Sequence, residues 1–228
     1  MPKAKAVPKP GATTINIPPI QVDVMRVRVK GLTPLIAHKF SEKTRKQLLD
    51  KSMNKKVKTR EAKDPEALFN AARYRVDENG IYTSGDGADA IPARYFKEAM
   101  IEAARLIDGV SMVEMRQLIF VEPGVDGIPI LNGKGTYGLN GIEPEVDESI
   151  QRVGGKGRGT GTPDVRFRPL YRQWGAEFDV HYNANLVGPE EVLNLLNYAG
   201  FHCGVCEHRP SKSGGQNGQF QVVEAVNG

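Results

Sequence analysis

The chain has little of several residues on which whole classes of protein depend. Its 228 residues include only two cysteines, one tryptophan and four histidines, and aromatic residues make up 7% of the total. Two cysteines that lie close together do not form the disulfide framework of a small secreted domain. No apolar run is long enough to cross a bilayer, and the N-terminus lacks the apolar segment of a signal peptide. We therefore expect a soluble, cytoplasmic protein with no membrane contact.

Several catalytic signatures are also missing. The sequence contains no Walker lysine loop, no Ser-His-Asp order and no dinucleotide-binding fingerprint. It also contains no internal repeat at useful strength. We therefore expect a binding protein that has no catalytic residues, no metal site and no cofactor.

Glycine, proline and unevenly distributed positive charge are what the chain does have. Twenty-five glycines and fifteen prolines indicate long loops, while 39% hydrophobic residues suffice for the core of one large domain. The net charge is only +4, but lysines and arginines are concentrated in residues 1–10, 39–63 and 152–172. Basic segments in separate loops are typical of proteins that bind an anionic polymer, because each neutralised phosphate releases counterions. The alternative is that each segment is a solvated surface.

Hydrophobic periodicity predicts the order of the elements. Residues 1–20 are expected to form a flexible basic arm, and residues 21–228 a single domain with insertions at about 38–75 and 123–164. Strands are expected at 21–30, 114–122, 165–172, 174–182 and 220–226, and helices at 91–106 and 188–199. Shorter helices are expected from Ser41 and from Asp64-Pro65, a turn at 77–80 and a mobile loop at 154–159. This order indicates an α+β fold of the ferredoxin-like (RRM-like, βαββαβ) class, with an antiparallel sheet and two helices on one face.

A glycine-rich, basic loop follows the last helix. The helix stops at Gly200, and the loop runs through His208, Arg209 and Lys212 to Gly218 before the final strand. Because few side chains stand in the way, the backbone N–H groups of such a loop can approach a phosphate closely. We expect this loop to form one wall of a groove for nucleic acid.

Three stretches, in this order, carry a resemblance to a known family. They are Gly31 to Ile36 (GLTPLI) after the first strand, Ile91 to Met100 (IPARYFKEAM) at a helix start, and the helix end and loop from Leu195 to Phe220. They resemble the apolar elbow, the Ile-Pro-Gly-Ser-Ser-Leu-Lys-Gly helix opening and the Gly-x-Gly turn with its glycine-rich loop of the RAMP superfamily of CRISPR effector subunits. The best comparison is the backbone subunit, which polymerises along a guide RNA. Ala93-Arg94-Tyr95 and Cys203 depart from the pattern, which fits a remote member serving another polymer such as single-stranded DNA.

The resemblance implies that Lys97 and the loop from His208 to Gly218 contact the backbone of a single strand. It also implies that the two insertions are a finger and a thumb that clamp RNA and contact the next copy in a head-to-tail assembly, with other effector subunits as further partners. Together with the basic segments, this gives a set of expected nucleic-acid-binding residues: Arg26, Arg28, His38, Lys39, Arg45, Lys46, Arg94, Lys97, Lys156, Arg158, His208, Arg209, Lys212, Ser213, Gly214 and Gly215. Aromatic residues near the basic segments are candidates to stack on bases, with ordinary packing as the alternative: Phe40, Tyr74, Tyr137 and Tyr171.

Two rival interpretations concern metal binding and catalysis. Cys203 and Cys206 with their neighbouring histidines offer zinc-type ligands, but no second Cys-x-x-Cys completes a site, and the pair follows a helix end instead of opening a helix. Some RAMP backbone subunits cut RNA with an aspartate before the Ile-Pro helix, and here Asp77, Asp86 and Asp89 fit that position poorly. Other RAMP proteins use histidine, for which His38 is the candidate.

The sequence therefore predicts a non-catalytic subunit that binds single-stranded nucleic acid and oligomerises along RNA, as the guide-RNA backbone subunit of a CRISPR-type ribonucleoprotein. The alternatives are a single-stranded DNA-binding protein of phage or mobile-element replication or recombination, and a RAMP-type endoribonuclease. A protein-interaction subunit whose basic loops dock acidic partners is a third.

Overall fold

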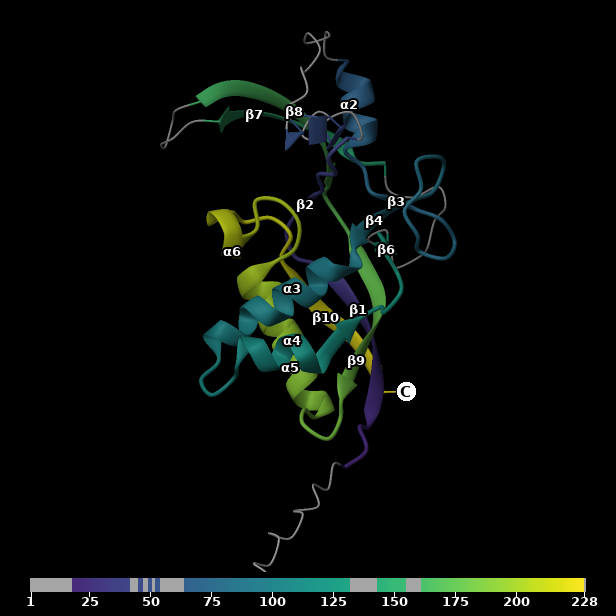
Figure 1. Ribbon diagram of the computed structural model, residues 1–228, viewed down its shortest axis with the longest axis vertical. Helices are drawn as coiled ribbons and strands as arrows, with labels where there is room; N and C mark the ends of the chain where they lie inside the picture. Colours follow the sequence, from purple (N-terminus) through teal and green to yellow (C-terminus); the bar gives the residue numbers. More distant parts are fainter. Residues whose placement is uncertain are drawn as a thin grey trace, which may run out of the picture.

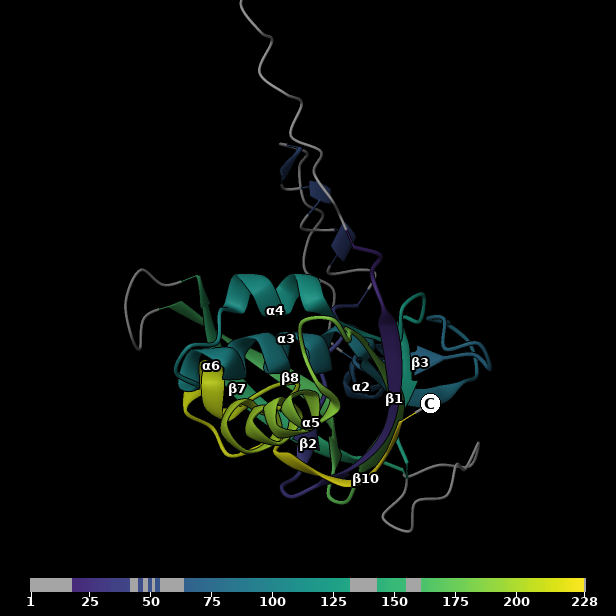
Figure 2. The same cartoon turned by 90° about the horizontal axis from the view of Figure 1, so that it is seen from below.

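The structure is a computed structural model that describes residues 18–41, 45–46, 49–50, 52–53, 64–131, 143–154 and 161–227. It shows an α+β fold built from antiparallel sheets (Figures 1 and 2). None of the helices in these ranges is long and apolar enough to cross a membrane.

A four-stranded sheet forms the centre of the molecule. It contains β1 (Val22–Gly31), β5 (Ile119–Val121), β9 (Gly175–Asn183) and β10 (Phe220–Asn227), in the spatial order β10-β1-β9-β5 with every neighbouring pair antiparallel. The strands expected at 21–30, 174–182 and 220–226 are therefore confirmed. On β1, Met25, Val27 and Val29 are buried while Arg26 lies on the exposed face, as the alternation in the sequence predicts.

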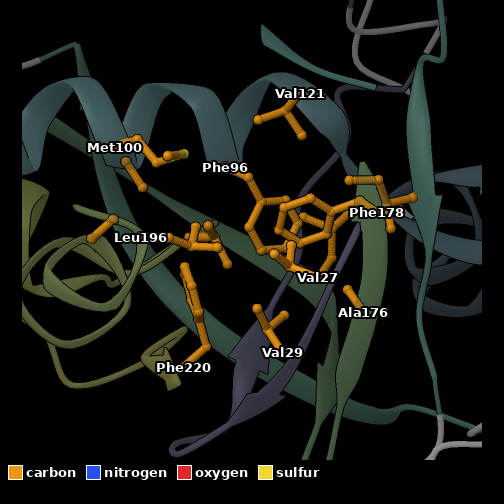
Figure 3. Packing of buried hydrophobic residues seen from close by; sticks show 14 of the residues in the cluster. Val27, Val29, Phe96, Met100, Val121, Ala176, Phe178, Leu196 and Phe220 are labelled. Carbon is orange, nitrogen blue, oxygen red and sulfur yellow. The ribbon is translucent and has the colours of Figure 1, made fainter. Parts of the chain in front are cut away.

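Two helices cover one face of this sheet. They are α3 (Ala93–Ala103) and α5 (Pro189–Tyr198), and both cross the sheet on the same side (Figures 1 and 2). Phe96 of α3 lies at the centre of the core, with its ring centroid 4.4 Å from that of Phe178 and 5.4 Å from that of Phe220 (Figure 3). Leu196 of α5 and Met100 of α3 complete this contact between helix and sheet. Along the chain the core elements follow one another as β1, α3, β5, β9, α5 and β10.

Two predicted elements around α3 need correction. The helix expected at 91–106 is α3, which begins after Pro92 as its N-cap, while Ile91 and Pro92 themselves close the strand β4 (Ala88–Pro92). Leu106, the last residue of the expected helix, is exposed in a 3₁₀ turn, Ala104–Leu106. The strand expected at 114–122 is instead the helix α4 (Met112–Leu118) followed by the short β5. Ser111 caps α4 by accepting a hydrogen bond from the N–H of Glu114, which favours a helix here over a strand.

A long hairpin occupies part of the insertion expected at 123–164. Strands β7 (Glu145–Gly154) and β8 (Gly161–Tyr171) pair over their whole length and extend away from the core at the top of Figure 1. β8 also pairs with β2 (Leu35–Ile36), which connects the hairpin to the chain just after β1. Cross-strand pairing within the hairpin stabilises β7, so its weak apolar alternation was a poor guide.

A third small sheet and several short helices complete the described chain. The sheet contains β3 (Arg75–Val76), β4 and β6 (Gly127–Pro129). The helix expected from Asp64-Pro65 is α2 (Pro65–Ala71), with Asp64 as its cap, and the turn at 77–80 is present. Arg45, Lys46, Leu49 and Asp50 are helical, as expected for the segment after Ser41. Residues 1–17 of the expected arm and residues 155–159 of the expected mobile loop lie outside the described residues.

Candidate nucleic-acid interface

The glycine-rich loop (residues 204–219) folds tightly between a π-helical turn, Ala199–Cys203, and β10. It contains a four-residue helix, α6 (Pro210–Ser213). A Cβ atom at Gly215 would lie only 1.8 Å from the carbonyl oxygen of His208, and one at Gly218 only 1.9 Å from that of Val205. Both close approaches are between backbone segments, so both positions require glycine. The glycines therefore allow the loop to fold back on itself.

The elbow after β1 (residues 31–36) holds the glycine-rich loop in place. The N–H of Gly218 donates to the carbonyl of Pro34 at 2.8 Å, and the N–H of Glu207 donates to the carbonyl of Ile36 at 3.0 Å. The N–H of Gln219 donates to Oγ1 of Thr33, again at 3.0 Å. The first and third stretches of the family resemblance are thus joined by hydrogen bonds, although more than half of the chain separates them.

Arg168 links the long hairpin to the same loop. Its side chain, on β8, is 1% exposed, and its Nε donates to Oδ2 of Asp147 on β7 at 2.9 Å. Its Nη1 lies 3.1 Å from Nε2 of His208. A buried guanidinium with two partners fixes the loop against the hairpin, because leaving either partner unpaired would be costly.

His38 lies next to this connection. Burial lowers the pKa of His38 from 6.5 to about 4, and Arg166 and Arg168 act in the same direction. The imidazole is therefore neutral around neutral pH. A neutral ring cannot pair electrostatically with a phosphate, so the structure favours a packing role for His38 over a charged contact.

A cluster of three tyrosines lies near the start of α3. The rings of Tyr74 and Tyr82 are 5.6 Å apart, and the hydroxyl oxygens of Tyr74 and Tyr95 are 3.3 Å apart. Two cations lie over these rings: the Lys39 Nζ is 5.6 Å from the centroid of Tyr82, and the Arg94 guanidinium carbon is 5.3 Å from the centroid of Tyr95. We call this group, Tyr74, Tyr82 and Tyr95, the tyrosine cluster.

The tyrosine cluster borders the glycine-rich loop. The Tyr74 hydroxyl donates to the carbonyl of His38 at 3.3 Å, and residue 36, two positions earlier, accepts from the loop. Burial raises the pKa of Tyr82 to about 12, and Cys206 of the loop contributes in the same direction. The elbow, the start of α3 and the loop therefore meet in one region of the surface.

Lys39 and Arg94 differ from Arg26 and Arg28 in their partners. In the part of the chain that the structure describes, neither has a carboxylate within ion-pair distance. By contrast, Arg26 pairs with Asp179 at 2.8 Å, and Arg28 lies between Glu177 at 2.7 Å and Glu224 at 2.9 Å. The exposed face of the sheet is thus a row of ion pairs, which leaves its arginines less available to phosphates.

Lys97 faces away from the tyrosine cluster. Its Nζ lies 3.9 Å from the centroid of the Phe120 ring on β5. Burial lowers its pKa, and Arg116 of α4 adds to this effect. The structure therefore places Lys97 on the β5 side of α3, apart from Lys39 and Arg94.

Only some loop residues of the expected set are available to contact a ligand. Arg209 turns back to donate to the carbonyl of Cys206 at 2.9 Å, and Lys212 is exposed with its Nζ 4.0 Å from a carboxylate oxygen of Glu207. Gly214 is exposed, and the side chain of Ser213 lies outside the described residues. Arg45 and Lys46 are exposed, while Lys156 and Arg158 lie outside the described residues.

The four expected stacking aromatics have different outcomes. Tyr171 is 1% exposed and Tyr74 is 9% exposed, so neither ring is accessible to a base. Phe40 is exposed. Tyr137 lies outside the described residues.

The two cysteines are buried, and two of the three candidate catalytic aspartates are held by hydrogen bonds within the protein. Cys203 and Cys206 are buried free thiols, and burial raises both pKa values, that of Cys203 to about 11. Within the described ranges, no group of three or more histidine, cysteine or acidic residues is placed to hold a metal ion. The two carboxylate oxygens of Asp89 accept from Nε and Nη2 of Arg73, at 2.8 and 2.7 Å. Asp77 accepts two backbone N–H bonds in its turn. Asp86 is exposed in its loop.

Three important residues were missing from the expected set. Tyr82 lies in a segment without basic residues, so charge gave no signal for it, and Tyr95 was omitted although it lies between Arg94 and Lys97. Arg168 belonged to a basic segment in which basic residues alternate with Val165 and Phe167. This alternation was the one local sign that the Arg168 side chain points to one face of a strand.

Comparisons with known proteins give little further information. No family model matches the chain. No curated protein matches it either. Among solved structures, a chain of the cryo-EM structure of the Type III-B Cmr-beta bound to cognate target RNA is similar, with 12% sequence identity and a TM-score of 0.45. The match covers 90% of this chain and 60% of that chain, so this chain spans less than two thirds of the protein it resembles.

Proposed function

We propose that this chain is a non-catalytic subunit of the RAMP type that binds single-stranded nucleic acid and assembles head to tail along a guide RNA. The order β1, α3, β5, β9, α5, β10 and the spatial order β10-β1-β9-β5 agree with a ferredoxin-like core, which the proposal assumes. The three stretches that resemble the RAMP pattern supply the rest of the argument.

One observation carries the proposal. Lys39 and Arg94 come from two distant segments and lie over one tyrosine cluster, beside the glycine-rich loop and the elbow. Cations without an acidic partner retain their full attraction for phosphate, and aromatic rings beside them suit the bases of an unpaired strand. A duplex hides the faces of its bases, so this combination favours a single strand.

The proposal includes no catalytic step. Asp89 is held by Arg73 in a network that also includes Tyr171, and Asp77 shapes a turn. These roles account for two of the three aspartates without chemistry on a substrate. The third, Asp86, is the residue to change when cleavage is tested.

The hairpin supports the proposed assembly. Val146 and Ile150 lie on the same face of β7 and are 56% and 71% exposed. Exposed apolar side chains on an arm that extends from the core are typical of a contact with another protein. We propose that this face contacts the next copy on the strand.

An electrophoretic mobility assay with single-stranded RNA, single-stranded DNA and duplex of the same sequence tests the function. The proposal requires binding to a single strand that is tighter than binding to duplex, with the RNA intact afterwards. Tighter binding of DNA than RNA would favour a single-stranded DNA-binding protein. RNA cleavage that is lost in Asp86→Ala or His38→Ala would favour an endoribonuclease. Absence of binding to all three ligands at low salt would contradict the proposal.

A further inference from the structure

We propose that Tyr82 is a stacking platform for one base of the bound strand, and that Lys39 leaves the ring to pair with a phosphate when the base arrives. This inference rests on the proposed function and adds to it a defined subsite with two residues in separate roles.

The protein holds the Tyr82 ring in a fixed position. The backbone N–H of Tyr82 donates to Oδ2 of Asp126 at 3.1 Å, and the residue forms an antiparallel bridge with Val76. A Cβ atom at Gly127 would lie 3.2 Å from Cε1 of Tyr82, which shows how closely the backbone of β6 approaches the ring. The Tyr74 ring packs beside it at 35°. A rigid ring loses little entropy when a base stacks on it, so this arrangement is prepared for binding.

Tyr82 is also the accessible member of the cluster. It is 37% exposed, whereas Tyr74 is 9% exposed. The Tyr95 hydroxyl is engaged with Tyr74, and Arg94 lies over the Tyr95 ring. Tyr82 alone in the cluster therefore combines a fixed ring with a substantial exposed surface.

The flexible side chain of Lys39 makes a cation–π contact with the Tyr82 ring. Its ammonium lies 5.6 Å from the ring centroid. An exposed cation–π contact changes an equilibrium by about 2- to 5-fold, whereas a stacked base changes binding by about 5- to 150-fold. The base therefore displaces the ammonium, and the released charge pairs with the phosphate next to that base.

The inference separates the effects of the two residues. Losing the Tyr82 ring removes a contact to a base, so affinity falls only for a strand that has bases. Losing the Lys39 charge removes a contact to a phosphate, so the salt dependence becomes shallower by about 0.7 in the slope of log affinity against log salt.

Fluorescence anisotropy with two ligands of equal length tests the inference: a single-stranded oligonucleotide and its abasic counterpart, which keeps the phosphates and sugars. The variants are Tyr82→Leu, Tyr82→Phe and Lys39→Ala, and Tyr198→Leu is the control because Tyr198 is another exposed tyrosine, located at the end of α5. We expect wild type, Tyr82→Phe and Tyr198→Leu to bind the normal strand more tightly than the abasic strand. In Tyr82→Leu this preference should shrink by about 5-fold or more.

Each negative result contradicts a different claim. If neither ligand binds wild type, the proposed function is wrong and the inference fails with it. If both ligands bind and Tyr82→Leu keeps the full preference for bases, the stacking inference is overturned while the proposed function stands. Urea unfolding of each variant separates a lost contact from a lost fold, and Tyr82→Phe provides a folded ring if the leucine variant is unstable.

Discussion

The guanidinium of Arg168 and the imidazole of His208 are 3.1 Å apart, and through this contact the long hairpin holds the glycine-rich loop. Asp147 binds the other side of the same guanidinium. The loop therefore depends on a strand that is far from it in the sequence, and the hairpin is part of the loop's support as well as a projecting arm.

Replacing Arg168 should destabilise the protein strongly. Arg168→Ala leaves the carboxylate of Asp147 without its partner, and we expect a loss of about 3–5 kcal/mol in the free energy of unfolding. The double variant Arg168→Met with Asp147→Leu removes both charges and should recover much of this loss. Urea unfolding of the single and double variants measures the coupling, and equal stability of Arg168→Ala and wild type would contradict the role assigned to the contact.

Adding one methyl group at Gly215 should disturb the loop. The methyl group of Gly215→Ala would overlap the carbonyl of His208, so we expect a loss of about 1–3 kcal/mol in stability and weaker nucleic-acid binding. Gly214→Ala is the matched control: Gly214 has a φ of 63°, but a Cβ there meets nothing within 4 Å. It should cost only about 1 kcal/mol from backbone strain. Affinity measured on both variants tests this, and a greater effect at Gly214 would count against the tight packing.

His38 should make stability depend on pH. The unfolded imidazole takes up a proton near pH 6.5, but the buried one does so only near pH 4. The unfolded state therefore binds more protons between these values, and the contribution of His38 is complete above about pH 6.5 and is lost as the pH falls toward 4. We expect His38→Gln to lose less stability across this window than wild type.

A urea titration at several pH values measures this difference. His202→Gln, which changes an exposed histidine, serves as the control. Parallel pH profiles for wild type and His38→Gln would show that the buried imidazole is not the cause.

Hydrophobic periodicity was sufficient to predict the strands and helices that bury one face and expose the other. The alternation of Met25, Val27 and Val29 predicted β1, and the spacing of Val192, Leu195 and Leu196 predicted α5. The same reasoning failed at 114–122, where Met115 and Leu118 fit a helix as well as a strand and the cap at Ser111 decided the outcome.

The candidate site was harder to predict because its members meet only in the fold. The basic character of Lys39 and Arg94 was visible, but their position over one cluster of rings depends on contacts of Tyr74 with the segment after the elbow and with α3. The sequence also assigned Arg26, Arg28 and Lys39 the same expected role, that of a cation that binds nucleic acid. The acidic partners of the two arginines lie on neighbouring strands, about 150 positions away along the chain for two of the three pairs, so no local pattern could reveal them.

Arg26 and Arg94 should differ in their effects on binding. Arg26→Gln removes a charge that already pairs with Asp179, and we expect affinity for a single strand to change by no more than about 2-fold. Arg94→Gln should reduce the salt slope by about 0.7, because one phosphate contact is lost. Equal losses in the two variants would show that the ion-paired face of the sheet also contacts the ligand.

The two thiols should be unreactive while the protein is folded. Burial raises the pKa of Cys203 to about 11 and that of Cys206 higher still, so little reactive thiolate forms near neutral pH. We expect slow reaction with a thiol reagent in buffer and fast reaction of both cysteines in guanidinium chloride. Fast reaction in buffer, or tight stoichiometric zinc binding, would contradict the packing role.

The most direct measurement of the central claim is the affinity for a single-stranded RNA over a series of salt concentrations, with wild type and the Lys39→Ala, Arg94→Gln double variant. The account predicts that log affinity falls linearly with log salt, depends little on base sequence, and has a slope that is shallower by about 1.4 in the double variant. Absence of binding at low salt, or a slope that the double variant leaves unchanged, would contradict it.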